Sequence, residues 1–296
     1  MDGIVWKGVN AMPTINTFGV IGGDERMRYL AASIAADGYP VCVHGFENLG
    51  PCRGAAEATL SELAKKSSVI LLPLPATRDG LTLNAPYAAA EIRLDDAFAS
   101  LFCNRTVYGG MIQRLVASSV LWREIEPEDY YRREELAVGN AIPTAEGAVS
   151  IAIQEYPGTL NGAKCLITGF GRIGKNLAII LRGMGARVYA AARKKEDLMH
   201  MRAFGVEPLT YREITQRFDV IFNTVPARVI GAPALTQQDA DTLLVELASA
   251  PGGIDLESAG RLGLHVVQAQ SLPGRVAPKT AAEYIKEAVY NMLEEA

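Results

Sequence analysis

The sequence predicts an α/β protein made of two doubly wound domains, each with a mainly parallel sheet. Two observations predict this class. Apolar strands alternate with helical segments along most of the chain, and the beginning of this alternation occurs twice. Aligning the two beginnings brings Gly23 opposite Gly169 and Arg26 opposite Arg172. Such a repeat of strand, glycine turn and helix is typical of two related domains in one chain.

The first beginning predicts a strand over Phe18–Ile21, a turn, and a helix over Glu25–Ala36. Ser68–Leu74 is a continuous apolar run, as expected for a buried parallel strand. The loop after it, Ala76–Pro86, carries Arg78 at the sheet edge where α/β proteins bind ligands. Three further elements are expected in this half: a strand at Val41–Val43, a helix at Asp95–Asn104 and a strand at Thr106–Met111.

The second beginning predicts a dinucleotide site. Gly169, Gly171 and Gly174 form a GxGxxG motif between an apolar strand and an amphipathic helix, and the strand Arg187–Ala192 follows. The first glycine permits a tight turn, the second lets the backbone approach a pyrophosphate, and the third lets the helix pack on the strand. The first half has no such motif, so only the second half is expected to bind a nucleotide. The expected cofactor contacts in this turn are Gly169, Phe170, Gly171, Arg172, Ile173 and Gly174.

The residues after the second strand favour NADP over NAD. NAD enzymes usually carry an acidic residue there for the ribose 2′-hydroxyl, whereas this chain has Arg193 and Lys194, followed by a further lysine. Cations at this place suit a 2′-phosphate. Glu196 and Asp197 would serve NAD if the strand ended later, so that alternative stays open.

Three later strand ends carry small or polar loops toward the same sheet edge. The strand Val220–Pro226 delivers Asn223, Thr224, Val225 and Pro226 beside the expected nicotinamide. The strand Leu243–Leu247 continues into Ala248–Asp255, which contains Ser249, and Gly263–Val267 leads into Gln268–Thr280. One such loop would be an ordinary turn, but three together indicate a ligand site.

The predicted division is residues 1–142, a flavodoxin-like substrate domain in which 1–16 is an extension, then 143–281, a Rossmann domain, and 282–296, a C-terminal helix. Pro143-Thr144 is expected to open a hinge helix whose body is Ala145–Glu155. Thr280–Glu283 forms a capping box before the last helix, which is expected to pack back on the first domain.

Composition excludes several classes. The 296 residues carry a net charge of −4 and are 49% hydrophobic, which argues against a nucleic-acid partner. We expect no membrane span and no signal peptide, and therefore a cytoplasmic protein with reduced, mostly buried thiols. Three histidines, none paired at ligand spacing, predict no metal site.

Five motifs together resemble the A-subunit family of dipicolinate synthases, from about Phe18 to the C-terminus. The last three are more specific than the glycine fingerprint. The loop Arg78–Glu91 does not align by motif. The motifs are Val20–Arg26, Ile167–Arg172, Phe222–Pro226, Leu247–Gly253 and Leu272–Ala281.

This resemblance implies NADP-linked oxidation of a dihydrodipicolinate-type ring to pyridine-2,6-dicarboxylate during sporulation. It also implies a flavoprotein-like B subunit, and hence a hetero-oligomer. Such a reaction needs cations for two carboxylates and orientation of the ring more than a strong base. The candidate substrate contacts are Arg26, Arg78, Ser249, Arg275 and Lys279, with Asp24 and Lys279 as candidate acid/base groups.

Each of these residues also has an interpretation without a functional role. Each candidate cation also fits a solvated surface charge, and Asp24 fits a helix cap. His44 and His265 are expected to be packing residues rather than catalysts. Two other functions stay open: a dehydrogenase of 2-hydroxy or 2-amino acids, and a non-catalytic NADP-binding regulatory subunit.

Overall fold

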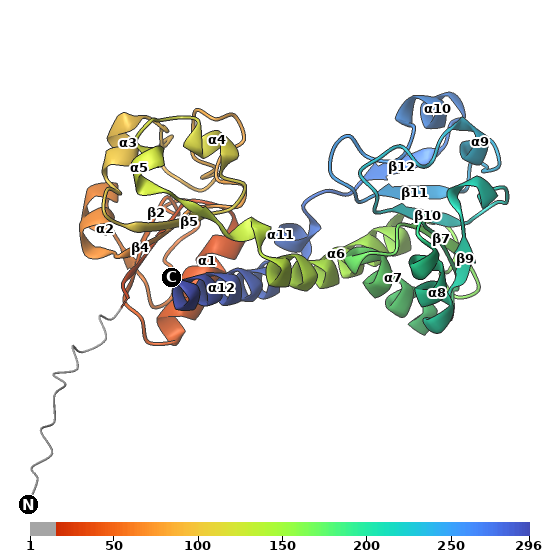
Figure 1. Ribbon diagram of the computed structural model, residues 1–296, viewed down its shortest axis with the longest axis horizontal. Coiled ribbons are helices and arrows are strands. Elements are labelled where there is room, and N and C mark those ends of the chain that lie inside the picture. The colour runs from red at the N-terminus through yellow and green to blue at the C-terminus, as the bar shows by residue number, and fades with distance from the viewer. Residues whose placement is uncertain (1–15) are drawn as a thin grey trace, which may run out of the picture. The chain divides into compact units, whose positions relative to one another are not determined.

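The computed structural model describes residues 16–296, which fall into two compact units (Figure 1). Unit 1 runs to Arg132 and also includes Ile285–Ala296, whereas unit 2 is Arg133–Tyr284. The expected extension at residues 1–16 lies almost wholly outside the described residues.

Unit 1 is built on a six-stranded parallel sheet with the order β3-β2-β1-β4-β5-β6. Without the two-residue edge strand β3, the other five follow the flavodoxin-like order. The strands are β1 (Phe18–Ile21), β2 (Val41–His44), β3 (Ala56–Glu57), β4 (Val69–Leu71), β5 (Thr106–Gly109) and β6 (Glu128–Asp129). The helices are α1 (Glu25–Ala36), α2 (Leu60–Lys66), α3 (Asp96–Ser100), α4 (Gln113–Val116) and α5 (Trp122–Ile125), with a 3₁₀ turn at Tyr130–Arg132.

Unit 2 has a second six-stranded parallel sheet, with the order β12-β11-β10-β7-β8-β9. This is the Rossmann order, in which the direction of strand addition reverses between β7 and β10. The strands are β7 (Lys164–Thr168), β8 (Arg187–Ala191), β9 (Glu207–Leu209), β10 (Val220–Asn223), β11 (Leu243–Glu246) and β12 (His265–Gln268). The helices are α6 (Glu134–Glu155), α7 (Arg172–Gly183), α8 (Lys195–Ala203), α9 (Ala232–Leu235), α10 (Leu256–Arg261) and α11 (Leu272–Val276), and the unit also contains the beginning of α12 (Pro278–Glu295).

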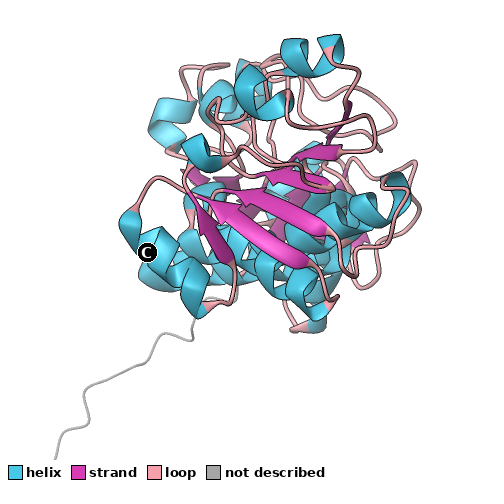
Figure 2. Cartoon of the chain, turned by 90° about the vertical axis from the view of Figure 1, so that its right-hand side faces the viewer, coloured by secondary structure: helices cyan, strands magenta, loops and turns pink. Residues whose placement is uncertain are grey.

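The sequence produces these sheets because their central strands are apolar on both faces. All residues of β1, β4 and β10 are buried, and β7 is buried after its first residue. Strands buried on both faces need helices above and below them, and Figure 2 shows helices around the magenta strands. The expected class of two doubly wound α/β domains is confirmed. The short strands β3, β6 and β9 were not expected.

Helix α6 corrects the predicted start of the hinge helix. Pro143 and Thr144 were expected to open this helix, but it begins at Glu134 and Pro143 lies inside it. Proline removes one internal hydrogen bond at a cost of about 3 kcal/mol, which packing along 22 residues offsets here. By length and composition alone, the same helix could cross a membrane, although no membrane span was expected. Half of its apolar window is buried inside the protein, as in the core helix of a folded domain.

The C-terminal helix also begins earlier than expected. Pro278 is its first residue, so Thr280 lies inside the helix and is not its cap. In unit 1, Lys286 Nζ lies 2.9 Å from Asp37 Oδ2 and donates to Ser33 Oγ at 2.7 Å. The Tyr290 hydroxyl bonds the same carboxylate at 3.0 Å. These contacts join the middle and C-terminal part of α12 to the last turn of α1.

Candidate functional site

The turn between β7 and α7 has the geometry that a dinucleotide requires. Gly169 has a φ of +87°, where L side chains are strained, and its N–H donates to the Ala191 carbonyl. A Cβ there would lie 2.5 Å from Thr224 Oγ1. A Cβ at Gly174 would meet the Gly169 carbonyl oxygen. Both glycines are therefore required for the turn to form, with or without a ligand.

Gly171 differs from them. A Cβ at this position would meet no atom within 4 Å, and its φ of −84° suits any residue. It is the N-cap residue of α7, and no side chain caps that helix. The first amides of α7 therefore face space that the surrounding protein leaves open. An uncapped helix N-terminus favours an anion through its N–H groups and its dipole.

The N-terminus of α1, the equivalent helix of unit 1, is capped by a side chain of the protein. Asp24 is the N-cap of α1, and its carboxylate accepts the Arg26 N–H at 3.0 Å. The Gly23 N–H donates to the Asn84 carbonyl, and a Cβ at Gly22 would lie 2.8 Å from Ala85. A carboxylate and a loop thus occupy the place that is open in unit 2. This supports the expectation that only the second half binds a nucleotide.

The other residues of the glycine turn anchor it. Phe170 is buried and packs edge-to-face on Phe204, with ring centroids 5.6 Å apart, and Ile173 packs on the same core. Arg172 Nη1 donates to Glu134 Oε2 at 2.9 Å, which ties the start of α7 to α6. These contacts leave backbone N–H groups, rather than side chains, as the anion donors of the turn.

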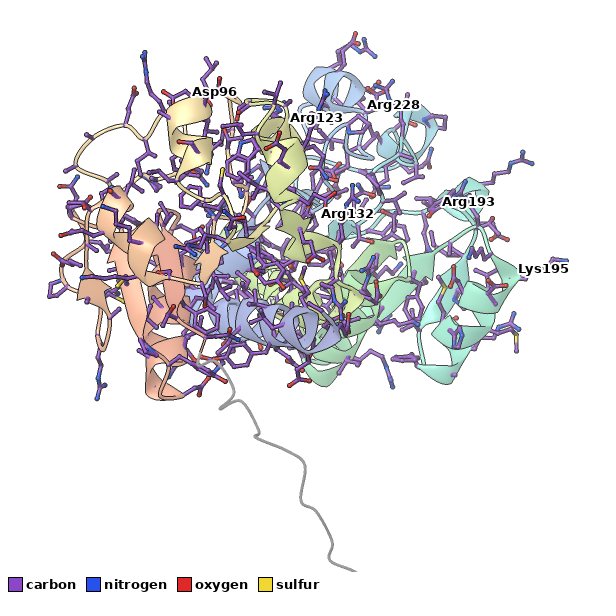
Figure 3. All side chains as sticks on the ribbon, turned by 60° about the vertical axis from the view of Figure 1, so that its left-hand side comes forward. Asp96, Arg123, Arg132, Arg193, Lys195 and Arg228 are labelled. Atoms are coloured by element: carbon purple, nitrogen blue, oxygen red, sulfur yellow. The ribbon has the colours of Figure 1, made fainter. Side chains whose placement is uncertain are left out.

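The strand end that selects between NAD and NADP carries cations. β8 ends at Ala191 and α8 begins at Lys195, so Glu196 and Asp197 lie in the first helical turn and not at the strand end. Arg193 is exposed and, within residues 16–296, makes no side-chain hydrogen bond. Lys194 Nζ lies 3.5 Å from Glu196 Oε1. Figure 3 shows Arg193 and Lys195 projecting away from the ribbon.

The end of β10 belongs to a buried polar network. Asn223 accepts the Thr168 hydroxyl at 2.5 Å and the Val225 N–H at 3.2 Å. Its amide donates to Glu246 Oε1 at 2.6 Å and to the Val225 carbonyl at 3.0 Å. Thr224 Oγ1 donates to the Thr168 carbonyl at 2.8 Å. Asn223 and Thr224 therefore hold the strand end, and the expected cofactor contacts of Asn223, Thr224, Val225 and Pro226 stay predictions.

Glu246 was missed by the sequence analysis. It ends β11 and is 2% exposed. Its only signal in the sequence is a lone carboxylate that ends an otherwise apolar strand, shortly before a Gly-Gly pair.

Asp24 and Arg26 of unit 1 form an ion pair that fixes the orientation of the guanidinium. Arg26 is 8% exposed, and its Nε and Nη2 lie 2.9 and 2.7 Å from the two Asp24 oxygens. Nη2 also donates to the Leu74 carbonyl at 2.7 Å. The Nη1 group makes no hydrogen bond within residues 16–296. The guanidinium is thus oriented with one nitrogen left for another acceptor, and Asp24 both caps α1 and holds Arg26.

The remaining candidate substrate contacts are exposed. Arg78 and Ser249 are both exposed residues of the loops in which they were expected. Arg275 lies in α11 and Lys279 in the first turn of α12, where a stiff loop had been expected. α11 forms because Val276 and its neighbour Leu272 pack beside Gly147 of α6. None of these four side chains makes a hydrogen bond within the described part of the chain.

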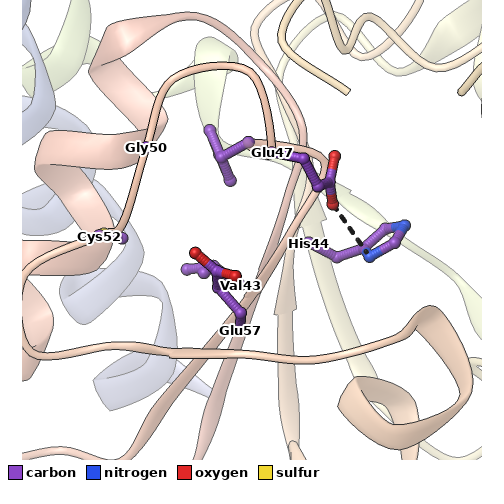
Figure 4. A pocket seen from close by; sticks show the side chains of 7 residues that line it. Val43, His44, Glu47, Gly50, Cys52 and Glu57 are labelled. Carbon is purple, nitrogen blue, oxygen red and sulfur yellow. Dashed lines mark ion pairs between the residues drawn. The ribbon is translucent and has the colours of Figure 1, made fainter. Parts of the chain in front are cut away.

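The described residues give little support for a catalytic histidine or for a metal site. His44 Nδ1 lies 2.9 Å from the Ala58 carbonyl, and His265 is at the start of β12, away from the carboxyl edge of the sheet. No group of three metal-binding side chains occurs in residues 16–296. A small cavity in unit 1 is lined by His44, Glu47, Cys52 and their neighbours (Figure 4). It has room for about one water molecule, too little for a ring dicarboxylate.

The chain matches known proteins in both units. Residues 17–130 match the family of the N-terminal domain of the dipicolinate synthase A-subunit, and residues 144–250 match the family of D-isomer specific 2-hydroxyacid dehydrogenase, NAD binding domain. The dipicolinate synthase A-subunit of Bacillus subtilis (strain 168) is 27% identical over 282 residues, which are 93% of this chain and 95% of that protein.

Solved structures agree with these matches. The dipicolinate synthase A-subunit from Bacillus halodurans superposes with a TM-score of 0.85 at 27% identity, and the match covers 96% of this chain and 99% of that one. A transhydrogenase from Sinorhizobium meliloti has a TM-score of 0.70 at 18% identity, over 94% and 93% of the two chains, and shares the fold alone. The resemblance drawn from the motifs is confirmed, and unit 2 contains a dehydrogenase-type domain for a nicotinamide dinucleotide.

Proposed function

We propose that the chain oxidises a dihydrodipicolinate-type ring to pyridine-2,6-dicarboxylate with NADP. In this proposal it acts in the cytoplasm during sporulation, together with a flavoprotein-like B subunit. One observation carries the proposal: an N-terminal domain of the dipicolinate synthase A-subunit type is followed by a dinucleotide domain whose phosphate-facing helix is uncapped. The match of residues 144–250 to a dehydrogenase NAD-binding domain supports an oxidoreductase more generally.

The residues fit a nicotinamide dinucleotide. The open amides of α7 would hold the pyrophosphate, Gly171 would let it approach, and Arg193 with Lys194 would hold a 2′-phosphate. The cofactor, when bound, supplies the hydride acceptor that the oxidation needs. The choice of NADP over NAD rests on the two cations after β8 and on the absence of an acidic residue between Ala191 and Lys195.

The oxidation of the ring needs little acid/base catalysis from the protein. The ring loses a hydride from one carbon and a proton from another ring atom, and aromatisation drives both losses. The protein must hold two carboxylates and orient the ring. We assign one carboxylate to Arg26 Nη1, because this buried guanidinium is already fixed by Asp24 and Leu74. Asp24, engaged by Arg26, is a positioning group rather than a base.

A contact with a substrate carboxylate is proposed separately, without reference to Arg26, for the segment of unit 2 that carries Arg275 and Lys279. If one of them binds it, the matching alanine variant should lower kcat/KM by roughly ten- to a hundredfold, with NADP affinity unchanged. Both single variants are compared at saturating NADP with Arg261→Ala, an exposed arginine of α10 that pairs with Glu257. Two unchanged kcat/KM values would exclude this segment and leave Arg78 and Ser249 as candidates.

The whole proposal is tested by incubating the purified chain with NADP and a dihydrodipicolinate-type substrate generated in situ, with and without a flavoprotein B subunit. The expected result is the ultraviolet absorption of a pyridine dicarboxylate, formed together with an equal amount of NADPH. Nucleotide binding without turnover in either mixture would contradict the proposal and support a regulatory NADP-binding subunit.

A dehydrogenase of 2-hydroxy or 2-amino acids is the second candidate, favoured by the family match of residues 144–250. Such enzymes generally need a positioned His or Lys at the nicotinamide. His44 and His265 are the residues to test, although neither lies at the carboxyl edge of the sheet in unit 2. If their Gln variants abolish oxidation of a 2-hydroxy acid that the parent protein oxidises, the second candidate is correct.

A further inference from the structure

Glu246 is a carboxylate buried at the carboxyl end of β11, and four N–H groups surround it. Oε1 accepts the Asn223 amide at 2.6 Å and the Ala248 N–H at 3.1 Å. Oε2 accepts the N–H groups of Gly253 at 2.8 Å and Ile254 at 3.0 Å. All four neighbours donate and none accepts from Glu246, which matches an ionised carboxylate, because a protonated carboxyl would carry an O–H that needs an acceptor.

The charge of Glu246 has no counterion among the described residues. None of the ion pairs within residues 16–296 includes it, and its four partners are neutral amides. Neutral donors stabilise a buried carboxylate without cancelling its field. A negative potential therefore extends from the end of β11 into its surroundings, where little solvent screens it, since the side chain is only 2% exposed.

The position of this charge relates it to the cofactor site. β11 pairs with β10, and β10 pairs with β7, so Glu246 lies on the strand next to Asn223 and two strands from the glycine turn. Dinucleotides bind across the carboxyl edge of such sheets, with their two halves on either side of the reversal in strand order. The adenosine half belongs with β7 and β8, which places the nicotinamide half on the side of β10 and β11.

We propose that Glu246 biases the site toward the oxidised dinucleotide. The oxidised nicotinamide ring carries a positive charge and the reduced ring is neutral, so a fixed buried negative charge on this side favours the oxidised form. This is the form that the proposed oxidation consumes, and the inference rests on that proposed function for its biological meaning. The bias itself is a property of unit 2 and of any nicotinamide dinucleotide.

A purely structural role would give a different result. Glu246 also fixes the loop Ala248–Ile254, and a Cβ at Gly253 would lie 2.5 Å from the Asn223 amide nitrogen. Loss of the loop geometry alone would weaken the oxidised and reduced dinucleotides equally. Loss of the charge weakens only the oxidised form. The ratio of the two dissociation constants therefore separates the two roles.

The test is Glu246→Gln, with the dissociation constants of NADP⁺ and NADPH measured by calorimetry or fluorescence in the absence of any ring substrate. The ratio Kd(NADP⁺)/Kd(NADPH) should rise by roughly four- to fifteenfold, the range for a partly screened pair of unit charges in a protein-like medium. Glu257→Gln is the matched control, since it removes the same charge from an exposed site on α10. An unchanged ratio in Glu246→Gln would overturn the proposal.

A second variant covers the case in which Glu246→Gln does not fold. The double variant Asn223→Asp/Glu246→Gln reverses the direction of the hydrogen bond between the two positions and moves the carboxylate from β11 to β10. It should keep the parental ratio within about threefold, and a folded double variant that has lost the bias would contradict the inference. Because no ring substrate is used, failure of the dipicolinate proposal in its own assay would leave this result intact.

Discussion

Replacing Gly171 by valine should abolish nucleotide binding while the protein stays folded. The side chain would enter space with no protein atom within 4 Å of its Cβ, and the φ of −84° is accessible to valine. Valine is a poorer N-cap residue than glycine, which costs about 1 kcal/mol. For a chain of this size such a loss lowers Tm by about 2–4 °C.

The loss of binding should be much larger than the loss of stability. The branched side chain would stand between the pyrophosphate and the first amides of α7. Each charge-assisted hydrogen bond contributes about 1.5–3 kcal/mol. Losing two of them costs about 3–6 kcal/mol, which weakens binding by at least about a hundredfold.

Thermal melting and titration with NADP measure the two effects on one preparation. Glu25→Val is the control, because Glu25 is the first residue of α1 in unit 1, directly after the Asp24 cap, and its nucleotide affinity should equal that of the parent protein. Gly174→Ala should instead destabilise the fold, since its Cβ meets the Gly169 carbonyl. Normal NADP binding by Gly171→Val would refute the placement of the pyrophosphate.

Three further predictions concern charges and thiols. Arg193→Ala should weaken NADP binding by about 1.5–3 kcal/mol and NAD binding much less; equal losses in parallel titrations would rule out a 2′-phosphate contact. The hydrogen bond from Lys286 holds the pKa of Asp37 below its ordinary value of 3.8, so this ion pair stabilises the protein above that pH and the stabilisation is lost as pH falls through the lowered pKa. Lys286→Ala should therefore lower Tm at pH 7 by an amount worth less than about 1 kcal/mol, and by less still near pH 3, which melts over a pH series would show. A maleimide should label the exposed Cys103 first, and burial, which raises the pKa of Cys165 to about 12, should keep that thiol unreactive; mass spectrometry of early time points would reveal the opposite order.

Much of the fold follows from local patterns in the sequence. The strand Phe18–Ile21 and the helix Glu25–Ala36 have the predicted bounds, because a buried apolar run and an aspartate cap fix them locally. The glycine turn and the cations after β8 were also predictable from spacing. Local signals misled at Pro143, where packing of a long helix outweighs the cost of an internal proline.

The site was less predictable where its geometry depends on distant segments. Glu246 reads in the sequence as one polar residue at a strand end, and its role follows only from loop amides seven and eight positions later. The orientation of Arg26 likewise depends on the Leu74 carbonyl, 48 positions away along the chain. Neither contact has a spacing rule from which the sequence alone could predict it.

The helices that follow the two glycine turns differ in what lies at their N-termini. Both α1 and α7 begin with the same partial positive charge. In α1 the neutralising anion is the Asp24 carboxylate, whereas in α7 it has to come from a bound ligand. A built-in carboxylate is never lost by dilution, so unit 1 keeps its turn at any metabolite concentration. Unit 2 gains stability only as its ligand accumulates, and its melting temperature should report the nucleotide level directly.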